Sequence, residues 1–100
     1  MAKNNRQTSI EETTRGGLLV KVFSLTDGLS VYEDVTLVRL TGKDQNLLIL
    51  RNYLPLIGKL DGNVEIVTHD QVEQLKGIRG FYMFRNNQFD LLIEEDDYVR

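Results

Sequence analysis

The sequence predicts a small all-β protein, a two-sheet β-sandwich or flattened barrel built from short strands. After residue 16, apolar residues recur mainly with a period of two, which is the spacing of a β-strand. Turn signals containing Gly, Asn or Asp recur about every 8–12 residues, as in sandwiches and small barrels. No segment carries a helical apolar stripe across three turns.

The length and the N-terminal composition predict one domain with a tail. The chain has 100 residues, which suits one hydrophobic core. Residues 1–15 are polar, with almost nothing to bury, and are predicted to be a mobile polar tail. The single β-sandwich domain is therefore placed at residues 16–100.

The first strand is predicted in the segment LLVKVFS, residues 18–24. Leu18, Val20 and Val22 share one face of this strand, while Leu19 and Phe23 share the other. A strand that is apolar on both faces is typically buried on both. The TDG turn signal that follows ends this strand.

Three further strands are predicted in the middle of the chain. Val35–Leu40 is followed by the polar turn TGKDQN and by the short apolar segment Leu47–Leu50, which is predicted to be a buried strand. The DGN turn signal at 61–63 leads into a strand in which Val64 and Ile66 face one way.

The last part of the chain is predicted to form a hairpin. Its strands are Gly80–Arg85 and Phe89–Glu95, and Asn86–Asn87 between them tolerate the positive φ of a tight turn. In the preceding segment HDQVEQLKG, Val72 and Leu75 are three residues apart. This spacing fits a strand and a single helical turn about equally well.

Composition excludes several classes of function. The net charge of −3 argues against a nucleic-acid partner, which would need a basic face. No apolar run approaches the roughly 20 residues of a membrane helix, so direct membrane insertion is not expected. The chain has no cysteine, and it lacks an apolar secretory segment. A cytoplasmic location fits these features.

No catalytic constellation is found, so we predict a protein that is not an enzyme and has no cofactor or metal site. His69 is the only histidine and is interpreted as a solvated polar residue. The acidic run Glu94–Asp97 lacks the pattern of a calcium loop and is interpreted as a solvated strand end. Ser9, Ser24 and Ser30 lack the context of a nucleophile.

The aromatic residues of the C-terminal hairpin are predicted to serve packing. Phe81 and Phe89 are expected in the core. Tyr82 and Phe84 alternate with Phe81 along their strand. Their face is either the second side of the sandwich core or part of an interface.

The order of these segments resembles a known family. QNLLILRNYLPL aligns without a gap with the family pattern G-x-L-G-I-x-P-G-H-x-P-L, and the matching residues are Leu47, Ile49, Pro55 and Leu56. VKVFSLTDGLSVYEDVTLVRLTGKD looks like the family's first strands, and GFYMFRNNQFDLLIEE is similar to its closing hairpin. From about Leu18 to Asp96, the chain resembles the N-terminal β-sandwich domain of the epsilon subunit of F-type ATP synthases.

The chain departs from the family pattern in two respects. Gln45 and Leu48 stand where the family has glycines, and Arg51-Asn52-Tyr53 stands for Pro-Gly-His. Family members usually continue into a C-terminal helical hairpin that acts as a brake and sometimes binds ATP. The present sequence stops at Arg100, either as a natural short form or as a piece of a longer chain, so those roles are not carried over.

The resemblance implies a non-catalytic central-stalk subunit that couples proton or ion translocation to ATP synthesis. Its partners would be the gamma subunit and the c-ring, at the inner face of the membrane. The residues expected on the ring side are Lys43, Asp44, Arg51, Asn52 and Tyr53. Weaker candidates for the gamma side are Tyr82 and Phe84. The alternative is a stand-alone interaction module that kept the fold and lost the motor role.

Overall fold

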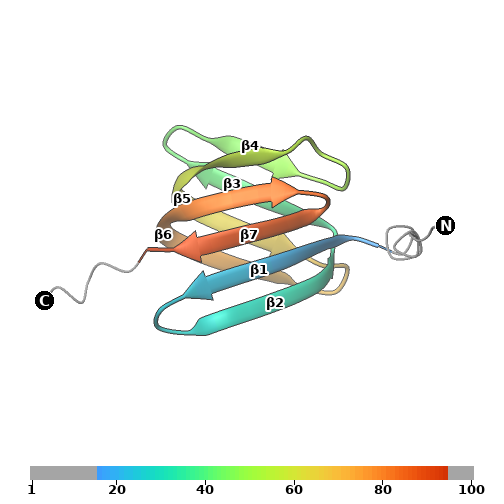
Figure 1. Ribbon diagram of the computed structural model, residues 1–100, viewed down its shortest axis with the longest axis horizontal. Helices are drawn as coiled ribbons and strands as arrows, with labels where there is room; N and C mark the ends of the chain where they lie inside the picture. The colour runs from blue at the N-terminus through green and yellow to red at the C-terminus, as the bar shows by residue number, and fades with distance from the viewer. Residues whose placement is uncertain (1–15, 95–100) are drawn as a thin grey trace, which may run out of the picture.

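The computed structural model describes residues 16–94, and every regular element in that range is a β-strand (Figure 1). The seven strands are β1 (Leu18–Ser24), β2 (Gly28–Val35), β3 (Leu37–Gly42), β4 (Asn46–Ile49), β5 (Leu56–Val67), β6 (Val72–Arg85) and β7 (Gln88–Ile93). The prediction of an all-β fold is therefore confirmed. The predicted mobile tail at residues 1–15, and residues 95–100, lie outside the described part of the chain.

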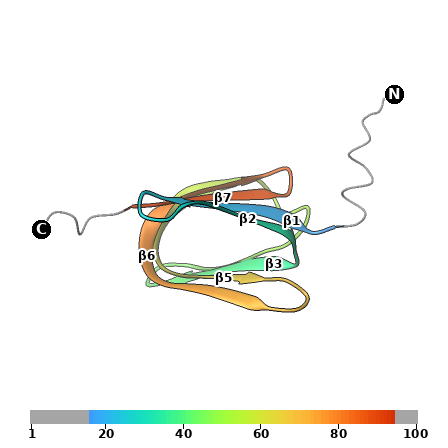
Figure 2. The ribbon, with the colours of Figure 1, turned by 90° about the horizontal axis from the view of Figure 1, so that it is seen from below.

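The strands form one sheet that folds into two layers. Their order is β2-β1-β7-β6-β5-β3-β4, with β1 and β7 parallel and all other neighbours antiparallel. We call β2, β1 and β7, together with residues 78–85 of β6 and 56–62 of β5, the β1 layer. We call β3, together with residues 64–67 of β5 and 72–75 of β6, the β3 layer. Figure 2 shows β6 curving from one layer into the other.

The two strands that connect the layers are long, whereas short strands were predicted. β5 has 12 residues and β6 has 14. Between the pairs Gly62/Ile78 and Val64/Leu75, one residue of β5 lies opposite two residues of β6, which is a β-bulge. Gly77 occupies the bulge with a φ of 63°, and its N–H donates a hydrogen bond of 2.9 Å to Asn63 Oδ1. The segment left open between strand and helix is thus a strand interrupted by a bulge.

The DGN segment, predicted to be a turn, instead lies inside β5. Gly62 pairs with Gly42 of β3. A Cβ atom on Gly62 would overlap the backbone oxygen of Thr41 and would lie 2.7 Å from the Cα of Gly42. This glycine is therefore required by the close approach of two strands and not by a reversal of the chain.

The core lies between the two layers and is formed by alternate residues of each strand. Val20, Val64 and Ile66 are fully buried, on the faces predicted from their spacing. The strand predicted at Leu47–Leu50 is only partly buried, since Ile49 is fully buried while Leu48 is 39% exposed. The reason is the period of the strand, since Ile49 faces the core with Val38 while Leu48 faces the outer side opposite Arg39.

The predicted C-terminal hairpin is confirmed and Phe89 is buried as expected, but the inner and outer faces of β6 are reversed. Asn86 and Asn87 have φ angles of 53° and 60° and form the turn between β6 and β7. Phe84 pairs with Phe89 across the hairpin, and both are fully buried. The ring of Tyr82 stacks on Phe89 with a centroid distance of 5.9 Å.

The reversal corrects two predictions about aromatic residues. Phe81, expected in the core, is 44% exposed, whereas Tyr82 and Phe84 are buried and are not available to a partner. The physical reason is the period of the strand. Because Phe84 faces inward with Phe89, Phe81 must face outward.

Candidate partner-binding face

The outer side of the β1 layer carries a contiguous group of exposed apolar side chains. We call it the apolar face, and it consists of Phe23, Leu29, Val31, Ile57, Phe81, Met83 and Leu92. Each of these side chains is between 36% and 79% exposed. The β1 layer lies toward the viewer in Figure 1. An exposed apolar patch of this kind is the usual mark of a binding surface on a soluble protein.

The first row of the apolar face crosses four strands. The strand pairing places Leu29 opposite Phe23, and Phe23 opposite Leu92. Leu92 in turn lies opposite Phe81. Lys59 of the next strand closes the row, with its Nζ 5.7 Å from the centroid of the Phe81 ring. This distance is within the range of a cation–π contact.

The second row has apolar residues at both ends and two charged residues, Lys21 and Asp90, between them. Lys21 of β1 lies opposite Val31 on one side and opposite Asp90 of β7 on the other. Met83 and Ile57 continue the row on β6 and β5. The Asp90 carboxylate accepts hydrogen bonds of 2.9 and 3.3 Å from Nε2 of Gln88. A shallow groove with a mainly apolar lining runs across this face.

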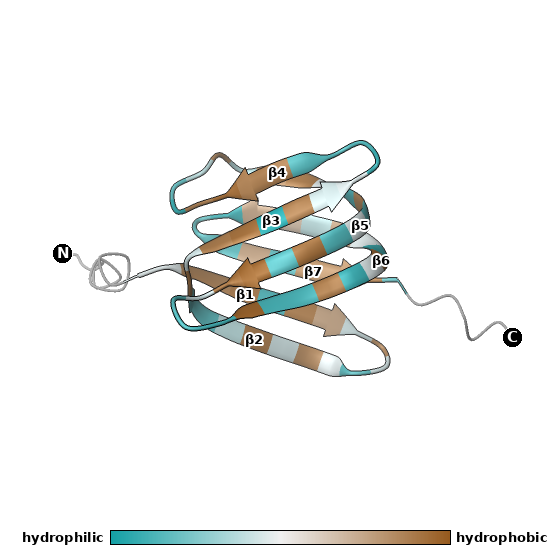
Figure 3. Cartoon of the chain, turned by 180° about the vertical axis from the view of Figure 1, so that it is seen from behind, coloured by the Kyte–Doolittle hydropathy of each residue, from teal (hydrophilic) through white to brown (hydrophobic). Residues whose placement is uncertain are grey.

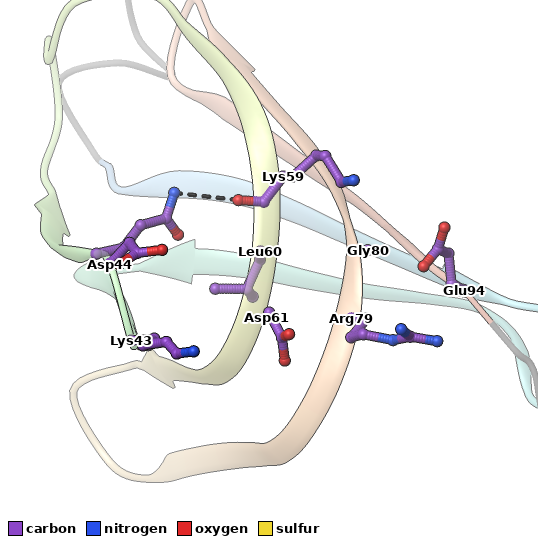
Figure 4. A pocket seen from close by; sticks show the side chains of 10 residues that line it. Lys43, Asp44, Lys59, Leu60, Asp61, Arg79, Gly80 and Glu94 are labelled. Carbon is purple, nitrogen blue, oxygen red and sulfur yellow. Dashed lines mark hydrogen bonds between the residues drawn. The ribbon is translucent and has the colours of Figure 1, made fainter.

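Lys43 and Asp44, predicted on the ring side, lie in the turn between β3 and β4. They line a depression together with Asp61, Arg79 and Glu94, so the charges gathered at this end of the sheet are mixed (Figure 4). Within the β3–β4 connection, Gln45 holds the turn in place.

The contacts of Gln45 fix this turn to the sheet. Its Nε2 donates hydrogen bonds of 3.1 Å to the carbonyl of Lys59 and to the hydroxyl of Tyr82. The bond to the Lys59 carbonyl is the dashed line in Figure 4. The side chain at one of the family's glycine positions therefore braces the β3–β4 turn against β5.

Arg51, Asn52 and Tyr53 lie in the loop between β4 and β5. Asn52 has a φ of 66°, a value that Asn tolerates better than other non-glycine residues. Its N–H donates a hydrogen bond of 2.6 Å to Oδ1 of Asn87, and Nδ2 of Asn87 donates one of 3.3 Å to Oδ1 of Asn52. The loop is thus tied to the turn between β6 and β7.

The five residues predicted on the ring side do not form one surface. β4 runs antiparallel to β3, so the β3–β4 turn and the β4–β5 loop lie at opposite ends of β4 (Figure 3). Lys43 and Asp44 are therefore separated from Arg51, Asn52 and Tyr53 by the length of a strand. The resemblance to the epsilon family implied that they belong to one partner-facing loop region.

Two features that the sequence offered as possible chemical sites are exposed where the structure describes them. His69 is exposed in the connection between β5 and β6. Among residues 16–94, no group of three His, Cys, Asp or Glu side chains is arranged to hold a metal ion. Glu94 is exposed, and the rest of the predicted acidic run lies outside the described residues. Burial, together with the nearby Glu73 carboxylate, raises the pKa of the Tyr32 hydroxyl.

The sequence interpretation missed the apolar face. Its signal was present, because Phe23 falls on the outer face of a strand whose other face is also apolar. That pattern was interpreted as burial on both faces. The structure shows that Phe23 is 41% exposed, because the described residues provide no layer that covers this side of β1.

One property of the structure bears on membrane topology, and two comparisons with known proteins bear on identity. No helix among the described residues is long and apolar enough to cross a bilayer. The sequence matches no protein-family model, and it matches no curated protein.

Proposed function

We propose that this chain is a non-catalytic subunit that binds a partner protein through its apolar face. The observation that carries the proposal is the row formed by Phe23, Leu92 and Phe81, which is exposed on a sheet whose core is complete without it. Aromatic and aliphatic side chains gathered on a rigid surface are typical of the centre of a protein–protein interface.

The specific form that we propose is a central-stalk subunit of an F-type ATP synthase-like complex. The resemblance of the sequence to the epsilon family is one support. A second support comes from Asn52, which stands at a glycine position of the family pattern and has a φ of 66°. The residue differs from glycine, but the backbone conformation that favours glycine is kept.

In this proposal the gamma subunit occupies the apolar face and the c-ring contacts the β4–β5 loop. The gamma contact thereby moves from the buried Tyr82 and Phe84 to Phe23, Phe81 and Leu92. The ring contact falls on Arg51–Tyr53, a polar loop held in place by the β6–β7 turn. The subunit does no chemistry and couples rotation to synthesis by holding both partners.

Co-purification with the gamma subunit of the same organism tests the first contact. The full chain is expected to retain gamma, and a Phe23→Ser, Leu92→Ser double variant is expected to lose at least about tenfold in affinity, since central apolar anchors carry most of the binding energy. An Arg39→Ser, Gln74→Ser variant, changed on the outer side of the β3 layer, is the matched control. If the unmodified chain does not retain gamma, the rotor form of the proposal is wrong.

The second contact is tested by an Arg51→Ala, Tyr53→Ala variant. Tyr53 is exposed and Arg51 is only partly buried, so the free energy of unfolding should change little, while association with isolated c-ring should weaken. Extensive unfolding of this variant would show that the loop belongs to the core and is not a contact surface.

The second candidate is a stand-alone interaction module without a motor. The feature that favours it is the β4–β5 loop, in which Arg51 and Tyr53 replace Pro and His of the family pattern. The gene neighbourhood distinguishes the two candidates. Adjacent genes for gamma, alpha, beta and ring subunits support the rotor form, and their absence, together with loss of gamma binding, supports the stand-alone module.

A further inference from the structure

We propose that the free chain forms a symmetric dimer in which the apolar faces of two copies pack against each other. This inference uses the same face as the proposed function but does not depend on which partner that function involves. It follows from the pattern of side chains across four neighbouring strands, β2, β1, β7 and β6. That pattern is complementary to itself.

The relevant symmetry is a two-fold axis parallel to the strands and midway between β1 and β7. Such an axis turns one sheet onto the face of the other and keeps every cross-strand row opposite itself. It brings β1 of one copy over β7 of the second copy, and β2 over β6. An interface with this symmetry is isologous, so every contact occurs twice.

The apolar residues meet apolar residues under this symmetry. In the first row, Phe23 meets Leu92 of the second copy, and Leu29 meets Phe81. In the second row, Val31 meets Met83. Sheets that pack face to face lie about 10 Å apart, which side chains of this size fill from both sides.

The charged residues meet residues of opposite sign. Lys21 and Asp90 occupy the centre of the second row and are exchanged by the axis, so each lies over its opposite in the second copy. Glu33 is the next outward residue of β2 after Val31, and Arg85 is the next outward residue of β6 after Met83. The same axis places Glu33 over Arg85.

These two charge pairs are the reason to choose a second copy as the occupant of the face. Across β2, β1, β7 and β6, four of the outward charged residues alternate in sign as negative, positive, negative and positive, namely Glu33, Lys21, Asp90 and Arg85. The axis reverses the order of the strands, so each of these charged side chains lies over one of opposite sign in the second copy. Such a pattern is complementary to itself, and complementary charges across an interface fix partner and orientation.

The test begins with the mass of the full chain in solution, measured by light scattering over a concentration series. The unmodified chain is expected to shift from one chain to two as its concentration rises. Lys21→Asp and Asp90→Lys each place like charges at the centre of the interface, and each should raise the dissociation constant of the dimer at least about tenfold. Glu65→Lys, on the outer side of the β3 layer, should leave the dissociation constant unchanged.

Mixing the two single variants gives the sharpest outcome. Lys21→Asp carries two acidic residues at the centre of the interface, and Asp90→Lys carries two basic residues. Together they should form a heterodimer at concentrations at which each alone is a monomer. Circular dichroism checks that both are folded. If one is not, Glu33→Arg and Arg85→Glu replace them with the same logic.

Three results would overturn the proposal. They are a chain that stays monomeric throughout the series, a dimer unaffected by Lys21→Asp, and folded variants that stay monomeric when mixed. Gamma retention is measured separately, so loss of the dimer and loss of the proposed function remain distinguishable. If both proposals hold, gamma should dissociate the dimer, because the two occupants share one face.

Discussion

The outer sides of the two layers differ in whether their side chains find polar partners within the chain. On the β3 layer, Arg39 forms an ion pair with Glu65, at 3.3 Å from Nε to Oε1. The other carboxylate oxygen of Glu65 accepts a hydrogen bond of 2.9 Å from Nε2 of Gln74. Along β3 and β5, polar and apolar residues alternate (Figure 3). On the β1 layer the corresponding row is Leu29, Phe23, Leu92 and Phe81.

The difference arises within two continuous strands. β5 and β6 run through both layers, and the bulge at Asn63 and Gly77 lies where they pass from one layer to the other. Polar side chains that pair within the chain need no partner. Apolar side chains that remain in water gain free energy when a partner covers them. The outer side of the β1 layer is therefore the surface at which we propose binding.

The largest expected effect separates the core from the apolar face on one strand. Phe84→Ala removes a fully buried ring and should lower the free energy of unfolding by about 3–5 kcal/mol. Phe81→Ala, three residues away and exposed, should lower it by less than about 1 kcal/mol. Urea denaturation, at a protein concentration at which the chain is monomeric, measures the stability loss of both variants. Equal losses would mean that the apolar face is already covered in the free chain, and the comparison would fail.

A second prediction tests the distinction between buried and outer side chains on β4, the last strand of the sheet. Ile49→Ala removes a fully buried side chain from β4 and should cost about 2–4 kcal/mol of stability. Leu48→Ala should cost less than about 1 kcal/mol, since Leu48 lies on the outer side opposite Arg39. Thermal unfolding of both variants provides the measurement. A larger loss for Leu48 than for Ile49 would contradict the observed orientation of β4.

The alternation of apolar residues was sufficient to predict the all-β fold. It also predicted the face of β1 that carries Val20 and the hairpin turn at Asn86–Asn87. It could not predict how the layers are joined. The length of β5 was hidden because Gly62 carries a turn signal, while its actual role is a close approach to Gly42. Short-range sequence patterns do not distinguish these two uses of glycine.

The apolar face was harder to predict than the core. On β6, both the inner pair Tyr82 and Phe84 and the outer pair Phe81 and Met83 are large and apolar. Period alone therefore does not say which pair is inside. The decision comes from the pairing of Phe84 with Phe89 across the turn, a contact that depends on the register of the hairpin. The ring-side residues stay a prediction, but period and turn signals did not show that β4 separates their two loops.

The third prediction concerns the bulge that divides the two surfaces. Gly77→Ala places a side chain at a φ of 63°, where a Cβ atom meets no neighbour but the backbone is unfavourable. We expect a loss of about 1–2 kcal/mol in the free energy of unfolding, from the cost of the left-handed conformation. Gly77→Asn should recover part of this loss, because Asn tolerates positive φ. Equal stability of all three chains would show that the bulge does not hold this conformation.

The smallest expected effect concerns the ion pair on the β3 layer. Arg39 and Glu65 are partly exposed, at 45% and 32% of their side-chain surface, so water screens their attraction. A double-mutant cycle with Arg39→Ala and Glu65→Ala should give a coupling energy of about 0.2–1 kcal/mol, and less at about 1 M salt. Neither variant should change dimerisation or gamma retention. A coupling well above this range, or a change in either association, would show that this side is not the solvated counterpart of the apolar face.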